Sequence, residues 1–412
     1  MEHSAHEEEA TAIVDRPQHR IPWVLGGAFI LLFMVRDFLV TENGIIGHSA
    51  FWGRDFVNVW TGGTMIREGL LPSLYDVQAY EAFQRSLFGR LDPHLYSYPP
   101  VSYPLASLFA LLPYPLALLA WTAATGALFV YAAKPWWPER AGPSWLAILT
   151  PAALVNLWAG QYGLLVGALF LLAWTRVDAS PRRAGIFFGL MLIKPHLAIL
   201  VPLILLIRRQ WTAFAWAAAT VVGLVAATIA AYGIKPWTDY LLHTSGVHVG
   251  LLNGIGLAGM MSASTITAVL RLGGSMVLAT GIYALFALAA LAMVVRAAAS
   301  RAPTRDIALL AATATFLIVP YSFNYDLTVV MIGAIWLLTR EDLSRGEERL
   351  ATYGFLAPQV GMVLSAFTIP VMPMMLLGLA YAQYRLALRG GMRSDEFLPE
   401  NKAFNSKTAL VG

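Results

Sequence analysis

Residues 211–232 read WTAFAWAAATVVGLVAATIAAY, a run that contains no charged side chain. A helix needs about 20 residues to cross about 30 Å of hydrocarbon, so this run is long enough to span a lipid bilayer. Residues 276–295, MVLATGIYALFALAALAMVV, form a second run of this kind. Together the two runs indicate an integral membrane protein.

The composition of the whole chain agrees with these two runs. Of its 412 residues 58% are hydrophobic and only 13% are charged, and the mean hydropathy is +0.62, whereas a soluble domain carries about 25% charged residues. The absence of cysteine excludes disulfides, thiolate metal sites and a cysteine nucleophile. The net charge of +4 does not indicate nucleic acid, because positive residues that flank apolar helices set membrane topology. We therefore expect membrane lipids around the chain and no nucleic-acid partner.

The apolar runs predict an all-α polytopic fold of about 12 transmembrane helices. We expect helices near 22–40, 115–133, 144–157, 160–175, 183–193, 195–207, 211–232, 276–296, 306–320, 326–339, 351–367 and 370–386. Several runs are short for a full span, and 183–193 and 195–207 are either separate helices or halves of one broken helix.

Lys and Arg set the expected orientation, because positively charged loops stay in the cytoplasm. With the N-terminus inside, most of the 28 Lys and Arg residues fall on the cytoplasmic side. The start of the chain holds the acidic run Glu7–Glu9 and does not resemble a cleavable signal peptide, so we expect the first apolar helix to be retained. The predicted organisation is a cytoplasmic tail (1–21), a transmembrane domain (22–386) and a second cytoplasmic tail (387–412).

Two long segments, about 41–100 and 233–275, are predicted to lie outside the cytoplasm. The first is long and rich in aromatic residues, so we expect short helices that lie on the membrane. It ends in a Pro-rich stretch, and the apolar run from there to Pro113 is too short to span and is either re-entrant or interfacial.

Ionisable residues at membrane depth are functional candidates, because each costs several kcal/mol unless it is paired or faces water. The topology places four polar groups on the outer side: Arg54-Asp55, Gly160-Gln161, Lys194-Pro195-His196 and Asn324-Tyr325-Asp326. Asp55 can take a proton from an attacking hydroxyl as a general base. The alternatives are an ion pair with Arg54 or a helix N-cap.

Lys194 and His196 interrupt an apolar run, and cations at this position can hold a phosphate group. The alternative for Lys194 is a side chain that snorkels to the membrane surface. Gln161 can bind a sugar hydroxyl or a neighbouring helix. Asn324 and Tyr325 belong to a polar turn in which Asp326 is either functional or the cap of the next helix.

Other kinds of site find no support in the sequence. His243 and His248 in the second outer segment fit solvated loop histidines better than substrate ligands. No spacing resembles a structural metal site, a phosphate-binding Gly-rich loop or a serine-hydrolase elbow. We expect no metal and no cofactor.

Several segments, in chain order, resemble glycosyltransferase family 87 of the glycosyltransferase C superfamily. They are Arg54-Asp55-Phe56 through Trp60-Thr61-Gly62-Gly63, Gly69 to Asp76, Tyr98-Pro99-Pro100, Ala159-Gly160-Gln161, Gly185 with Ile193-Lys194-Pro195, and Pro320 to Asp326. The resemblance implies inverting transfer of a sugar, with mannose favoured, from a polyprenyl phosphate donor to a lipid or glycan acceptor.

The resemblance also implies the place of the reaction and the role of individual residues. It places the reaction at the outer face of a bacterial plasma membrane, facing the periplasm or exterior, with Asp55 as the catalytic base. Arg54, Gln161, Lys194, His196, Asn324 and Tyr325 are the expected substrate-binding residues. The alternative from another class is a multi-pass transporter or lipid flippase, which also has many helices and intramembrane charges. A polymerase or ligase of surface glycans is a third possibility and differs mainly in the acceptor.

Overall fold

The computed structural model describes residues 28, 32, 35–42, 45–46, 50–89, 91, 95–242 and 256–396. The predicted N-terminal tail, His243 and His248 lie outside these residues. So does 397–412, most of the predicted C-terminal tail. Residues 387–396 continue the last helix beyond its expected end at 386.

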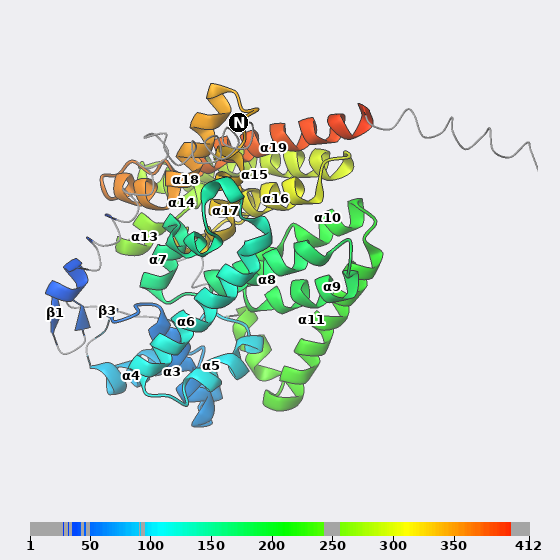
Figure 1. Ribbon diagram of the computed structural model, residues 1–412. Coiled ribbons are helices and arrows are strands. Elements are labelled where there is room, and N and C mark those ends of the chain that lie inside the picture. Colours follow the sequence, from blue (N-terminus) through cyan, green and yellow to red (C-terminus); the bar gives the residue numbers. More distant parts are fainter. Residues whose placement is uncertain are drawn as a thin grey trace, which may run out of the picture.

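The described chain is helical apart from a small antiparallel sheet of three two-residue strands, in the order β1 (Thr41–Glu42), β2 (Ile45–Ile46) and β3 (Ala50–Phe51) (Figure 1). The α-helices are α3 (Phe56–Arg67), α4 (Val77–Phe88), α5 (Tyr103–Phe109), α6 (Tyr114–Ala133), α7 (Pro151–Ala159), α8 (Gly163–Arg176), α9 (Pro181–Leu190), α10 (Val201–Ile207), α11 (Trp211–Tyr232), α13 (Gly256–Met261), α14 (Thr265–Arg271), α15 (Met276–Ala299), α16 (Thr304–Ile318), α17 (Thr328–Leu338), α18 (Arg345–Ala366) and α19 (Met372–Glu396). The 3-10 helices are η1 (Leu71–Ser73), η2 (Pro100–Ser102), η3 (Lys134–Trp136), η4 (Glu139–Ala141), η5 (Ser144–Leu149), η6 (Met191–Ile193), η7 (Pro195–Ala198) and η8 (Asn324–Asp326).

The apolar runs predicted the positions of the long helices. The run 211–232 is α11 with the same bounds, and the run predicted at 276–296 is α15. The run predicted at 144–157 is divided into η5 and α7, because Pro151 keeps the preceding Thr150 in an extended conformation. The prediction of an all-α fold is confirmed for the described residues.

Loops that are far apart in the sequence meet at one end of the molecule, which we call the basic end (134–143, 177–180, 208–210, 300–303 and 339–344). Asp178 accepts hydrogen bonds from Gln210 at 2.9 Å and from Thr304 at 3.1 Å. Arg208 donates to the carbonyl of Ser300 at 2.8 Å. The helices between these loops therefore leave the basic end and return to it.

Helices α9 and α10 form a hairpin and are not halves of one broken helix. The residues before α9 and after α10 are joined by the bond between Asp178 and Gln210, so both helices start or end at the basic end. The turn of the hairpin is Lys194, whose φ of −138° and ψ of 75° interrupt the helix before Pro195.

Within the described residues, three helices are long and apolar enough to cross a membrane: Tyr114–Trp136, Trp211–Tyr232 and Met276–Ala299. Gly163–Arg176, Pro195–Ile207 and Thr328–Leu338 are apolar but shorter. At 1.5 Å per residue, the 11 residues of α17 extend about 17 Å and the 24 residues of α15 about 36 Å. A membrane protein is therefore supported, and the count of about 12 crossings remains a prediction.

The short helices end well inside the molecule. Tyr162, at the start of α8, contacts Trp121 of α6 with 4.9 Å between ring centroids. Trp121 lies seven residues after Tyr114, where α6 begins, so Tyr162 is about 10 Å inward from that end of α6. At the basic end α6 and α8 finish at the same level, because the indole N–H of Trp136, just after α6, donates to the Thr175 hydroxyl of α8 at 2.7 Å.

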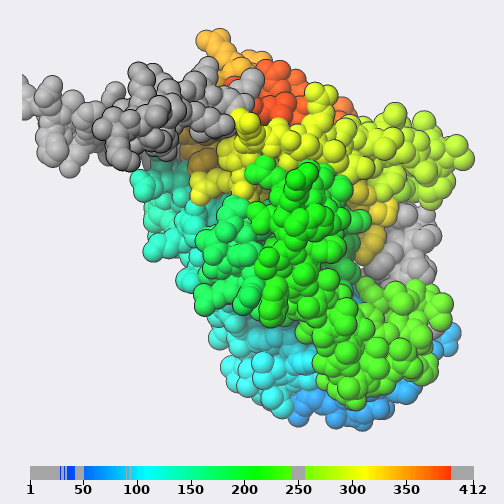
Figure 2. All heavy atoms as spheres, turned by 90° about the vertical axis from the view of Figure 1, so that its right-hand side faces the viewer, coloured from blue at the N-terminus to red at the C-terminus, as the bar shows by residue number. Residues whose placement is uncertain are grey.

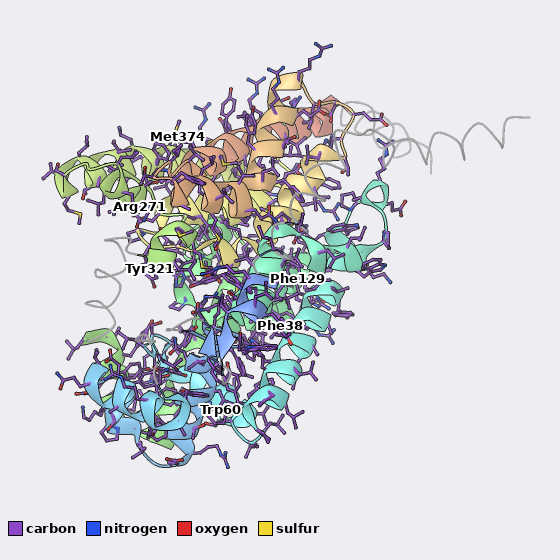
Figure 3. All side chains as sticks on the ribbon, turned by 90° about the vertical axis from the view of Figure 1, so that its left-hand side faces the viewer. Phe38, Trp60, Phe129, Arg271, Tyr321 and Met374 are labelled. Carbon is purple, nitrogen blue, oxygen red and sulfur yellow. The ribbon has the colours of Figure 1, made fainter. Side chains whose placement is uncertain are left out.

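The described residues between 50 and 113 (50–89, 91 and 95–113), which we call the cap, lie beyond the inner ends of these short helices. Figure 3 shows Trp60 of the cap at the lower end, with Phe129 of α6 and Tyr321 above it. In Figure 2 the blue and cyan cap residues lie below the green α9–α11 segments, and the yellow α15–α16 segments lie above them.

Helix α3 of the cap is mostly buried and packs closely against α5. A Cβ on Gly63 would come within 2.1 Å of the Ala106 carbonyl oxygen, so only glycine allows this approach. The short helices expected in the first outer segment are therefore present, but α3 is enclosed by protein.

Candidate functional site

A tight turn sets the position of Asp55 at the start of α3. Gly53 (φ +76°) and Arg54 (φ +42°) are consecutive left-handed residues, and the Phe56 amide donates to the Gly53 carbonyl at 2.8 Å. Left-handed backbone is unfavourable for arginine and persists only where neighbouring structure enforces it. Asp55 occupies the N-cap position of α3 and is half-buried, but its side chain does not cap the helix.

Neighbouring structure enforces the turn through a buried cluster of Asp37, Arg54 and Trp158. The Arg54 guanidinium donates from two nitrogens to the Asp37 carboxylate, at 3.1 Å from Nε and 2.7 Å from Nη2. The Trp158 indole donates to the same carboxylate at 2.7 Å, and the guanidinium lies 4.0 Å from the centroid of its ring. Arg54 thus pairs with Asp37, and the cluster joins residues 35–40 and α7 to the turn before Asp55.

The link between α7 and α8 brings Gln161 to Asp55. Gly160 ends α7 with a φ of +64°, and a Cβ there would lie 2.6 Å from the Cβ of Phe56 and 2.8 Å from the Gly53 carbonyl oxygen. Because glycine has no Cβ, the link can lie directly on the turn that carries Asp55. The Gln161 amide then donates from Nε2 to Asp55 Oδ2 at 2.7 Å.

Tyr98 of the cap binds the other end of the same amide. Its hydroxyl donates to Gln161 Oε1 at 2.9 Å, and its ring packs 4.5 Å from that of Tyr162. Burial raises the pKa of the Tyr98 hydroxyl well above its ordinary value, and the negative charges of Asp55 and Asp326 raise it further. Tyr98 therefore remains protonated and able to donate, and both carboxylates lie close enough to affect it.

Lys194 and Asp326 form a buried ion pair. The ammonium lies 2.8 Å from Oδ1 and 2.9 Å from Oδ2 of Asp326, and the two side chains are 7% and 3% exposed. Lys194 also lies 5.0 Å from the centroid of the Tyr325 ring. The lysine is thus enclosed and does not snorkel to the surface. Asp326 is not a helix cap, because α17 begins after Leu327 without a side-chain cap.

The turn that carries Asp326 is held against α8. Asn156 donates to the carbonyl of Tyr325 at 3.0 Å, and Thr328 donates to the carbonyl of Gly163 at 3.1 Å. A Cβ on Gly163 would lie 2.4 Å from that Tyr325 oxygen and 2.9 Å from Asp326 Oδ1. Glycine at 163 therefore allows Asp326 to approach the start of α8.

Two further predicted residues occupy the edges of this region. Asn324 is fully buried and donates to the carbonyl of Pro358 in α18 at 2.8 Å. His196 is half-buried, and its Nδ1 lies 3.4 Å from the hydroxyl of Tyr321. Asn324 thus links the turn to α18, and His196 lies two residues beyond the lysine of the ion pair.

The structure brings together most of the residues that the sequence singled out, because Asp55 contacts Gln161 and Lys194 contacts both Tyr325 and Asp326. The sequence analysis did not identify Asp37 or Trp158, and it considered Tyr98 only as part of a motif. Asp37 could have been recognised from the sequence, since it is a carboxylate at the end of an apolar run. Nothing in the sequence around Tyr98 or Trp158 distinguishes them from other buried aromatic residues.

Comparisons with known proteins support a single assignment. A scan against protein-family models matches residues 96–320 to glycosyltransferase family 87, which is more than half of the chain. The matched segment includes Tyr98, Gln161 and Lys194, and Asp55 precedes it. No curated protein and no solved structure matches the chain. In the described part of the chain, no group of three or more His, Asp or Glu side chains is placed to hold a metal ion.

Proposed function

Because this chain belongs to glycosyltransferase family 87, we propose that it transfers a sugar, with mannose favoured, from a polyprenyl phosphate donor to a lipid or glycan acceptor. Family membership indicates a glycosyltransferase, and the apolar helices indicate a membrane protein. The donor, the sugar, the acceptor and the mechanism are the proposal.

Asp55 is the proposed general base, and its contact with Gln161 is the observation that carries this assignment. The carboxylate is half-buried at the start of a helix and accepts a 2.7 Å hydrogen bond from the Gln161 amide. In the proposed step Asp55 takes the proton of the acceptor hydroxyl. The acceptor oxygen attacks the anomeric carbon, and the bond from that carbon to the donor phosphate breaks with its electron pair on the phosphate. Attack from the side opposite the phosphate inverts the anomeric centre.

Lys194 is the proposed partner of the leaving phosphate. A cation that faces the phosphate stabilises the negative charge that develops as the bond breaks. Asp326 holds the lysine in place at 2.8 Å, and Tyr325 lies beside it. His196 lies in η7, two residues beyond Lys194, and is proposed to assist Lys194 in stabilising the leaving phosphate. Substrate contacts of Arg54, Gln161 and Asn324 remain predictions, because their side chains bind protein groups.

The proposed location is a bacterial plasma membrane, with the site facing the periplasm or exterior. The basic end supports this orientation, since Arg140, Arg208 and Arg340 lie there and the Lys194–Asp326 pair lies at the other end of the helices. Loops rich in arginine are retained in the cytoplasm.

The test of the proposed base is Asp55→Asn in detergent-purified protein, with radiolabelled polyprenyl phosphate mannose as donor and a membrane lipid extract as acceptor. We expect turnover to fall about 10²-fold or more, the usual scale for loss of a general base. Asp76→Asn is the matched control, because Asp76 only caps α4 and asparagine caps equally well.

The outcomes separate the possible roles of Asp55. Wild-type turnover in a folded Asp55→Asn variant would refute the assignment of the base. A lower melting temperature with normal specific activity would indicate a structural role. Mass spectrometry of lipids and glycans after gene deletion tests the sugar, since loss of a residue other than mannose would correct the favoured donor. An unchanged lipid and glycan profile would favour the transporter or flippase.

A further inference from the structure

Tyr98, Gln161 and Asp55 form a chain of side-chain hydrogen bonds between three separate segments. The Tyr98 hydroxyl donates to Gln161 Oε1 at 2.9 Å, and Gln161 Nε2 donates to Asp55 Oδ2 at 2.7 Å. Tyr98 and Gln161 are both about 5% exposed. A buried chain of this kind has a direction, because each member must donate to the next.

The direction is fixed at the oxygen end of the Gln161 amide. Besides the tyrosine hydroxyl, the backbone N–H of Tyr162 points at Oε1 from 3.4 Å. A backbone N–H can only donate, so the atom that faces it must be the amide oxygen. The NH2 group of Gln161 therefore faces the Asp55 carboxylate, to which it donates its hydrogen bond.

Tyr98 is itself held at several points, so it can fix the amide. Its backbone carbonyl accepts a hydrogen bond of 2.6 Å from the Tyr75 hydroxyl. Its ring packs against Tyr162 on one side and Tyr96 on the other, with centroids at 4.5 and 5.4 Å. The cap thus presents one hydroxyl to Gln161 in a defined position.

We propose that Tyr98 and Gln161 are positioning residues that hold the Asp55 carboxylate in one orientation toward the acceptor hydroxyl. This inference rests on the proposed role of Asp55 as base, and it gives Gln161 a role toward the base in place of the sugar. A fixed carboxylate meets the acceptor in a reactive geometry without having to be ordered in each turnover.

The first test is Gln161→Met, which keeps the length and removes the amide, assayed with polyprenyl phosphate mannose and the lipid extract. We expect kcat to fall by about 10-fold or more, with KM for the donor changed by less than about 2-fold. The loss should fall on kcat of the folded protein, because only the orientation of the base is lost. A purely structural residue would lower the melting temperature and leave kcat and KM of the folded protein unchanged.

The second test is Tyr98→Phe, which keeps the ring and frees the amide to turn. The loss of kcat should be smaller here, about 3-fold or more, again with KM for the donor nearly unchanged, because Nε2 no longer has to face Asp55. Tyr96→Phe is its matched control, since Tyr96 is equally buried and its hydroxyl bonds Ser102 at 2.6 Å. Gln84→Met is the control for Gln161, since Gln84 is a buried amide that bonds Asn58.

The outcomes distinguish this inference from the proposed function. If Asp55→Asn abolishes transfer and both Gln161→Met and Tyr98→Phe keep the wild-type kcat, the positioning role is wrong and the base assignment stands. If Asp55→Asn is fully active, the base assignment itself fails. Should Gln161→Met not fold, the kcat of Tyr98→Phe against that of Tyr96→Phe decides alone.

Discussion

Removing the ammonium of Lys194 should destabilise the protein as well as impair transfer. In Lys194→Met the Asp326 carboxylate, whose side chain is 3% exposed, would keep its burial and lose its cation. Breaking a buried ion pair by removal of one partner costs about 3–5 kcal/mol, because the remaining charge is left uncompensated. A loss of activity in this variant alone would not separate a phosphate-binding role from a structural one.

A second substitution separates the two roles. Asn has the shape of Asp without its charge, and the space is tight, because a Cβ on Gly163 would already lie 2.9 Å from Asp326 Oδ1. Lys194→Met with Asp326→Asn should therefore regain most of the lost stability, because no buried charge remains. Asp326→Asn alone keeps the cation and should transfer more sugar than either variant that lacks the lysine.

The assay combines a melting curve in detergent with transfer from limiting polyprenyl phosphate mannose. We expect the double variant to melt near the wild-type temperature and to remain about 10²-fold or more impaired in transfer, the scale on which loss of one stabilising charge acts. Recovery of both stability and transfer would show that Lys194 only balances Asp326. A single variant Lys194→Met that melts like the wild type would refute the reasoning about the ion pair.

Two further predictions concern the backbone and the topology. Gly160→Ala should lower stability by about 1–3 kcal/mol more than its control and reduce transfer, because its Cβ would meet Phe56 at 2.6 Å. Gly69→Ala is the control, with φ +76° and open space around the new methyl, so equal effects would contradict the role of the contact. With no native cysteine, Arg85→Cys should be labelled by a membrane-impermeant thiol reagent from outside the cell and Arg301→Cys only from the cytoplasmic side. The reverse pattern would invert the topology.

The sequence predicted the helices well where hydrophobicity alone determines them. α11 has the bounds of its apolar run, because a charge-free run of 22 residues has few other ways to satisfy its backbone in a membrane. The prediction was less accurate at 144–157, where Pro151 divides the run. For 183–193 and 195–207 the sequence left two arrangements open, and the tertiary contact of Asp178 with Gln210 distinguishes them.

The polar groups could be predicted as a set but not as pairs. Alternation of loops across the membrane placed Asp55, Gln161, Lys194 and Asp326 on one side. Their partners follow from tertiary packing: Lys194 meets Asp326 across 132 residues, and Gln161 meets Asp55 across 106. Arg54 shows the limit most clearly. The sequence offered the adjacent Asp55 as one alternative partner, whereas Arg54 pairs with Asp37 through a left-handed backbone that the fold enforces.

The short central helices have a consequence for how substrates arrive. Gln161 adjoins Tyr162, which lies about 10 Å inward from the start of α6, one of the candidate membrane spans. If the proposed site and its proposed lipid-linked donor are correct, a site recessed to this depth meets the donor by diffusion in two dimensions, within the plane of the bilayer. The rate of transfer then depends on the mole fraction of donor among the surrounding lipids. Diluting the donor with inert phospholipid would lower this rate, as a lower substrate concentration does for a soluble enzyme.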